Sequence, residues 1–147
     1  MAAVAEKVES LFFQDETAWL EQTAQLIAER RFDDVDWAEL QEYLTDMAKR
    51  DKREVKNRLR VLLAHLLKWS RQPEKRTGSW KATILEQRLQ LKDQCQSGSL
   101  RNYAEEVFDE AYTQAVIIAA AETGLDSSAF PMSGQWTLAQ ALTDSFE

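Results

Sequence analysis

The sequence contains few of the residues that cross-link, bend or interrupt a chain. Among its 147 residues there are one cysteine, Cys95, two prolines and four glycines. A single cysteine can form neither an intramolecular disulfide nor a thiolate metal cluster, and an unpaired thiol is typical of a reducing compartment. We therefore expect a cytoplasmic protein whose core is held by packing alone. A chain of this length can bury roughly 70% of its unfolded surface.

The sequence also has no long apolar run. Its longest nearly apolar stretch, "LRVLLAHLLKW", is interrupted by Arg60, His65 and Lys68 and is too short to span a bilayer. The opening "MAAVAEKVESLFFQDE" does not combine a basic segment, an apolar run and a small-residue cleavage site, as a secretory signal would. We expect a soluble protein with no membrane partner.

Residues that usually carry out catalysis are scarce. The only histidine, His65, is far from Cys95 in the sequence, and there is neither a glycine-bracketed serine nor a His-Glu-x-x-His motif. The run "EEVFDE" at 105–110 places carboxylates one helical turn apart, as in metal-binding bundles. A di-iron bundle also needs two Glu-x-x-His motifs, however, and Leu62 stands three residues before His65. We predict a protein that is not an enzyme and has no metal or cofactor.

Charge is divided into three blocks along the chain. Residues 1–48 have twelve acids and three bases, a net charge of −9. Residues 49–92 have four acids and fourteen bases (+10), and residues 93–147 have nine acids and one base (−8). If the acidic ends fold back over the middle, the basic charge faces carboxylates of the same molecule. Otherwise a basic band is open to an anionic partner.

The residue pattern predicts an all-α fold. Alanine and leucine together number 36 and valine and isoleucine only 11, and no segment alternates apolar with polar residues as a half-buried strand would. We predict a single domain over residues 1–147, an antiparallel bundle of four or five helices plus a short C-terminal helix. Residues 1–14 and 143–147 are expected to fray.

Capping and breaking residues set the expected helix limits. One helix runs from Asp15 to about Arg31, and a second begins at a capping box of Asp36 and Glu39. The second helix has an inward face and either stops before the charged stretch at 49–60 or continues through it into the helix from Val55, which ends before a proline. Later helices begin at serines or a capping box and stop at glycines. The inward face consists of Trp37, Leu40, Leu44 and Met47. The proline is Pro73, the serines are Ser79 and Ser99, the glycines are Gly98 and Gly124, and the capping box is formed by Thr137 and Gln140.

Three segments resemble a known family. They are "LFFQDETAWLEQTAQLIAERRFDDVD", "RLRVLLAHLLKWSRQPEKRTGSWKATILEQR" and "AAETGLDSSAFP...TLAQAL", which together extend over roughly residues 11 to 143. On these segments the chain is similar to the bacterial domain-of-unknown-function family 29, common in cyanobacteria. The resemblance implies a small all-helical bacterial protein, and it supplies no catalytic residue.

The corner "HLLKWSRQPEKRTGSW" is the best candidate for a site. Cationic and hydroxyl side chains gather there at the start of a helix, where unpaired N–H groups and the helix dipole favour anions. Trp69 and Trp80 could stack on bases, but we expect them to pack on each other and close a helical hairpin. The candidate anion-binding residues are Lys68, Arg71, Lys75, Arg76, Ser79 and Lys81.

Two functions remain open at this stage, beside a hydrolytic or metal-dependent enzyme with an unusual site, for which the sequence has no motif. The first is a protein-interaction or assembly domain, whose partner is another protein or, in a homo-oligomer, a second copy of the chain. The second is binding of nucleic acid or another polyanion through the basic segment 49–92, where "KRDKREVKNRLR" has seven bases in twelve positions. Against the second, charge runs are usually solvated or internally paired, and a pI of about 4.9 repels polyanions at long range.

Overall fold

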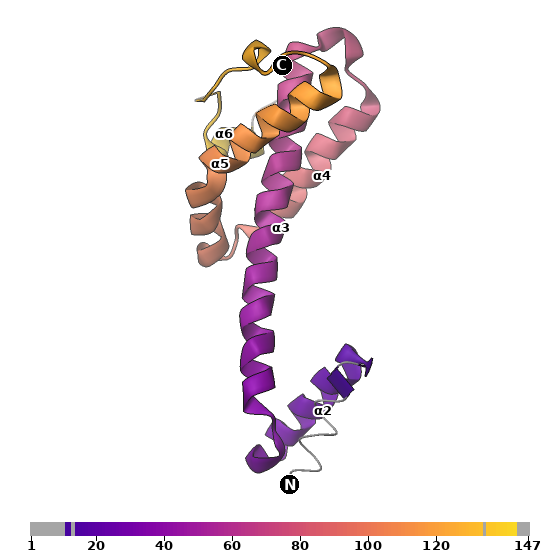
Figure 1. Cartoon of the computed structure of the whole chain (residues 1–147), viewed down its shortest axis with the longest axis vertical. Helices are drawn as coiled ribbons and strands as arrows, with labels where there is room; N and C mark the ends of the chain where they lie inside the picture. Colours follow the sequence, from indigo (N-terminus) through magenta and orange to yellow (C-terminus); the bar gives the residue numbers. More distant parts are fainter. Residues whose placement is uncertain (1–10, 13, 134, 144–147) are drawn as a thin grey trace. The chain divides into compact units, whose positions relative to one another are not determined.

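A computed structural model describes residues 11–12, 14–133 and 135–143 of the chain. Within these ranges all regular structure is helical (Figure 1), so the all-α prediction is confirmed. Five α-helices are described, together with three short 3₁₀ turns. They are α2 (Glu16–Ala28), η1 (Phe32–Asp34), α3 (Trp37–Arg71), η2 (Pro73–Lys75), α4 (Gly78–Gln94), α5 (Gly98–Thr123), η3 (Ser127–Ala129) and α6 (Leu138–Thr143).

The chain forms two compact units, Met1–Lys49 and Arg50–Glu147. The boundary lies inside α3, which continues without a break through the charged stretch. The boundary is therefore not a linker between two domains. The prediction of one domain over residues 1–147 stays a prediction. The predicted frayed tails, 1–14 and 143–147, lie mostly outside the described residues.

The first unit has a small aromatic core. Asp15 accepts a hydrogen bond from the Ala18 N–H at 3.0 Å and caps α2, as predicted. The helix then buries Trp19, whose ring centroid lies 5.0 Å from that of Phe12 and 5.4 Å from that of Tyr43. Leu26 and Val35 complete the buried set. Edge-to-face and tilted ring packing of this kind stabilises beyond the buried area alone.

The predicted inward face at the start of α3 is only partly covered. Leu40 is half-buried against the first core, as expected, but Trp37 is 50% exposed and Leu44 is 59% exposed. The prediction that Trp37 and Leu44 are buried is therefore wrong. Helical spacing places apolar side chains on one face, but it does not provide an element to cover them.

Two helix starts differ from the prediction by two residues. The N-cap of α4 is Thr77 rather than Ser79, and Thr77 Oγ1 accepts from the Trp80 N–H at 3.2 Å. The N-cap of α5 is Ser97 rather than Ser99, and its side chain accepts from the Leu100 N–H at 3.4 Å. In both cases the hydroxyl lies before the glycine that opens the helix, so that it can reach the N–H three residues on.

The second unit packs the later half of α3 with α4, α5 and α6. Here α3 is buried nearly all round, at Leu62, Leu63, Ala64, Leu66 and Leu67, as expected of a central helix. Short connections after α3 and α4 reverse the chain twice, so α3 and α5 run in the same direction with α4 antiparallel to both (Figure 1).

The end of the second unit is fixed by a cap and a buried arginine. Gly124 ends α5 in the left-handed conformation with φ of 75°, as predicted. Thr137 and Gln140 exchange the two hydrogen bonds of the predicted capping box, at 2.9 and 3.1 Å. Arg88, only 7% exposed, donates from Nε to the Ala141 carbonyl at 2.8 Å and so ties α6 to α4.

Candidate functional site

Three polar contacts between α3 and α5 involve basic side chains of the segment 49–92. All three join residues 54 positions apart, the constant offset expected for two helices running in the same direction. Two of them pair a lysine with a carboxylate of the acidic C-terminal block. The contacts are Lys56 to Glu110 at 2.8 Å, Arg60 to Gln114 at 3.2 Å and Lys68 to Glu122 at 2.5 Å.

Lys68, the first of the predicted anion-binding residues, faces the interior. It is 6% exposed, and its Nζ lies 2.5 Å from Glu122 Oε2 and 5.0 Å from the centroid of the Trp80 ring. Burying an ammonium is costly unless a carboxylate and other polar or π groups compensate it. Both compensations are present, so Lys68 has a structural role and its charge is already paired.

Arg76, in the same corner, also contacts the protein itself. Its Nε donates to the Trp69 carbonyl at 2.8 Å, and its guanidinium lies 4.8 Å from the centroid of the Trp69 ring. The side chain therefore holds the connection between α3 and α4 closed. A cationic side chain thus lies over each tryptophan ring, Lys68 over Trp80 and Arg76 over Trp69. Direct packing of Trp69 on Trp80 stays a prediction.

The remaining candidates lie at the surface. Arg71, Lys75, Ser79 and Lys81 are all exposed. Ser79 lies within the first turn of α4, and Thr77 already accepts one of the N–H groups that the prediction left for an anion. Of the six residues, Lys68 and Arg76 contact other parts of the protein, and all except Lys68 are exposed. The anion site that they were expected to form stays a prediction.

The two residues with the greatest chemical reactivity are partly or wholly buried. His65 Nδ1 lies 2.9 Å from the Val61 carbonyl, one turn back in α3, and desolvation lowers the pKa of the imidazole. Cys95 is a buried free thiol, and desolvation raises its pKa. A raised pKa leaves little thiolate at neutral pH, which makes Cys95 a poor nucleophile.

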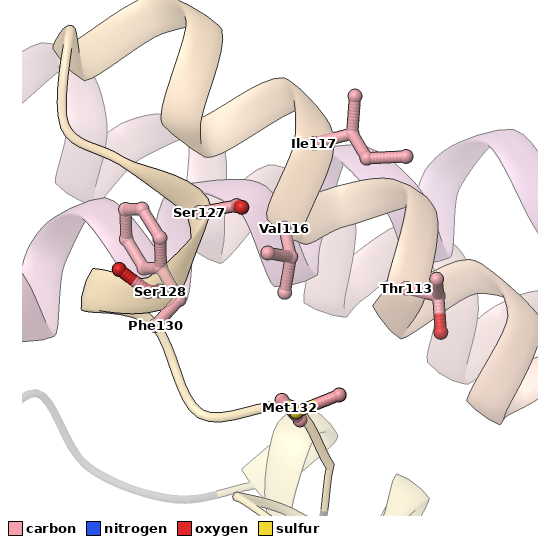
Figure 2. Close-up of a pocket in the computed structure, with 7 residues that line it drawn as sticks. All are labelled: Thr113, Val116, Ile117, Ser127, Ser128, Phe130 and Met132. Carbon is pink, nitrogen blue, oxygen red and sulfur yellow. The ribbon is translucent and has the colours of Figure 1, made fainter.

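A groove in the second unit was not foreseen from the sequence. It has a volume of about 420 Å³ and lies between α5 and the segment that follows it (Figure 2). Ile117 is 64% exposed and Met132 is 91% exposed, whereas Phe130 is 3% exposed. The lining residues are Thr113, Val116, Ile117, Ser127, Ser128, Phe130 and Met132. The sequence feature that could have indicated this groove is the apolar run "AVIIAAA". An unbroken run of this length cannot lie wholly on one buried face of a helix, so some of its apolar side chains must be exposed.

A comparison with protein families identifies the relationship. The profile of a family described as a domain of unknown function, DUF29, matches residues 11–147. This chain belongs to the DUF29 family. The match confirms the resemblance carried by the three sequence segments. Neither the curated proteins nor the solved structures contain a match to this DUF29 chain.

Two properties of the described part of this DUF29 chain bear on what it could bind. None of its helices is long and apolar enough to cross a membrane. Among the described residues, no three side chains of histidine, cysteine, aspartate or glutamate gather closely enough to hold a metal ion.

Proposed function

We propose that this DUF29 chain is a non-enzymatic protein-interaction domain of the bacterial cytoplasm. The observation that carries the proposal is an exposed aromatic pair in the first unit. Phe32 and Trp37 are 45% and 50% exposed, and their ring centroids lie 6.1 Å apart. The buried free thiol of Cys95 supports a reducing compartment.

The aromatic pair is held in place although it is exposed. The Trp37 indole N–H donates to the Phe32 carbonyl at 2.9 Å, which links the first turn of α3 to η1. Fixing a side chain before binding lowers the entropy lost when the complex forms. Tryptophan and other aromatic residues are enriched at protein interfaces, and tryptophan is a frequent hot spot.

Leu44 extends the same surface along α3. It follows Trp37 by two helical turns, so the two side chains point to the same side of the helix, and it is 59% exposed. Phe32, Trp37 and Leu44 thus present apolar area that water covers in the isolated chain. Contiguous exposed apolar area on a folded protein is typical of an interaction surface.

Site-specific photocrosslinking in the native host tests this proposal. A photoreactive phenylalanine at Phe32 should give a crosslinked product of discrete mass, containing either another protein or a second copy of this chain. The matched control is the same residue at Leu89, which is 62% exposed on α4 and should give no such product. Equal products at both positions, or none at Phe32, would contradict the proposal. Reproducible turnover of a defined small substrate, lost on one substitution, would do so as well.

Polyanion binding through residues 49–92 is the second candidate. Arg50 and Arg53 are exposed, and neither has an ion pair within the described residues. Against it, Lys56, Arg58 and Lys68 are each paired with a carboxylate. Phosphate contacts make affinity fall steeply with added salt. Binding of single-stranded DNA that weakens with salt and is lost in the Arg50→Glu, Arg53→Glu double variant would favour this candidate.

A further inference from the structure

The groove on α5 is apolar at its base and has acidic residues beside it. Phe130 is buried beneath it, and Ile117 and Met132 line it with strongly exposed apolar surface. Figure 2 shows Thr113, Val116 and Ile117 following one another along α5, with Met132 across the opening. A partner's side chain that moved from water into this groove would contact apolar atoms of two separate segments.

The same face of α5 continues into unpaired carboxylates. Asp109 lies one helical turn before Thr113, and Glu106 lies about one turn before that, so both extend the line of the groove. Both are exposed, and neither has an ion pair within the described residues. By contrast, Glu110 and Glu122, toward α3, are paired with lysines. Glu106 and Asp109 are therefore open carboxylates on the groove side of α5.

The far side of the groove has the same sign of charge. Asp126 comes directly before the lining residue Ser127 and is exposed; its carboxylate accepts the Ser128 N–H at 2.9 Å and stays ionised at neutral pH. After Arg101 the sequence contains no lysine or arginine. Arg101, in the first turn of α5, is therefore the one basic residue of α5 and of the segment that follows it. An occupant with basic side chains would supply charge complementary to Asp109 and Asp126.

We propose that the groove binds a basic amphipathic helix of a partner protein. Its apolar side chains, at i, i+3 or i+4 spacing, would lie against Val116, Ile117 and Met132, as in other helix-in-groove complexes. Its lysines or arginines, one to two turns away, would face Asp109 and Glu106. Charge complementarity selects a basic partner over an acidic one and speeds its association. This surface includes neither Phe32 nor Trp37, so the inference stands without them.

The test uses two synthetic helical probes and the full chain. Both probes are about four turns long with leucine at i, i+3, i+4 and i+7, and lysine fills the polar positions of one and glutamate those of the other. Titration calorimetry at low salt should show the lysine probe binding at least about tenfold more tightly. Equal affinity for the two probes, or tighter binding of the glutamate probe, would overturn the proposal.

Variants then locate the binding. Ile117→Gln should weaken binding of the lysine probe by about tenfold, because it removes one apolar anchor. Leu89→Gln, at a residue of matched exposure on α4, should leave the affinity within about twofold. Met132→Gln, at a 91% exposed residue, repeats the test without risk to the fold. Equal weakening by Ile117→Gln and Leu89→Gln would overturn the assignment. So would self-association of the chain that Ile117→Gln abolishes, because a second copy would then be the occupant.

Discussion

The pairing of Lys68 with Glu122 predicts an unequal response to removing each partner. The Lys68 side chain is 8% exposed, whereas that of Glu122 is 49% exposed. Glu122→Gln leaves a buried ammonium without its counter-charge. Breaking a fully buried pair costs about 3–5 kcal/mol, and water at the half-exposed glutamate reduces the expected cost to about 1–2 kcal/mol. Lys68→Met keeps most of the apolar stem and leaves a carboxylate that water can reach, so it should cost less, below about 1 kcal/mol.

Urea unfolding of the single and double variants measures these costs. The double variant, with Lys68→Met and Glu122→Gln, should be more stable than Glu122→Gln alone, because it no longer contains an uncompensated buried charge. Glu110→Gln is the matched control: its partner Lys56 is 24% exposed, and the change should cost less than about 0.5 kcal/mol. If Glu122→Gln cost no more than Glu110→Gln, or less than Lys68→Met, the structural role of Lys68 would be refuted.

Three further predictions concern helix ends and pH. Arg30 has φ of 59° after α2, a conformation that costs a side chain about 1 kcal/mol, so Arg30→Gly should raise the free energy of unfolding of the first unit by up to that amount in urea. Gly124→Ala should lower the thermal stability by about 1 kcal/mol from φ alone, since an added Cβ meets no atom within 4 Å; a neutral result would contradict the capping role. The pKa of His65 is lowered in the folded state, so the unfolded state takes up a proton first and stability falls as pH decreases through 6.5. In His65→Gln this acid-side loss should be smaller in unfolding curves recorded between pH 7 and 5, and an unchanged pH slope would count against it.

Local chemistry made most helix limits predictable. Asp15, Pro73, Gly124 and the box of Thr137 and Gln140 each act through backbone groups a few residues away, which a sequence pattern records directly. The errors at Ser79 and Ser99 have one cause. In each case an equally good hydroxyl, that of Thr77 or Ser97, precedes the glycine, and the sequence pattern does not distinguish the two possible caps.

Contacts between distant segments were not predictable. No local pattern shows that the ammonium of Lys68 meets a carboxylate 54 residues later, so the sequence predicts an open cation at a position where the structure has a buried ion pair. The exposure of Trp37 and Leu44 has the same origin, because the apolar spacing of α3 is similar where other helices cover it and where they do not. The groove depends on how the segment from Ser127 to Met132 folds back on α5.

Co-purification from the native source tests the central claim, that this DUF29 chain acts through protein contacts at Phe32 and Trp37. The chain and its Phe32→Ser, Trp37→Ser variant would be isolated at low salt, each with and without nuclease, and the co-purifying material quantified by mass spectrometry and absorbance at 260 nm. We predict a defined protein partner, or a second copy of the chain, that survives nuclease and is lost from the variant. Nuclease-sensitive absorbance equal in both, with no protein lost from the variant, would contradict the account.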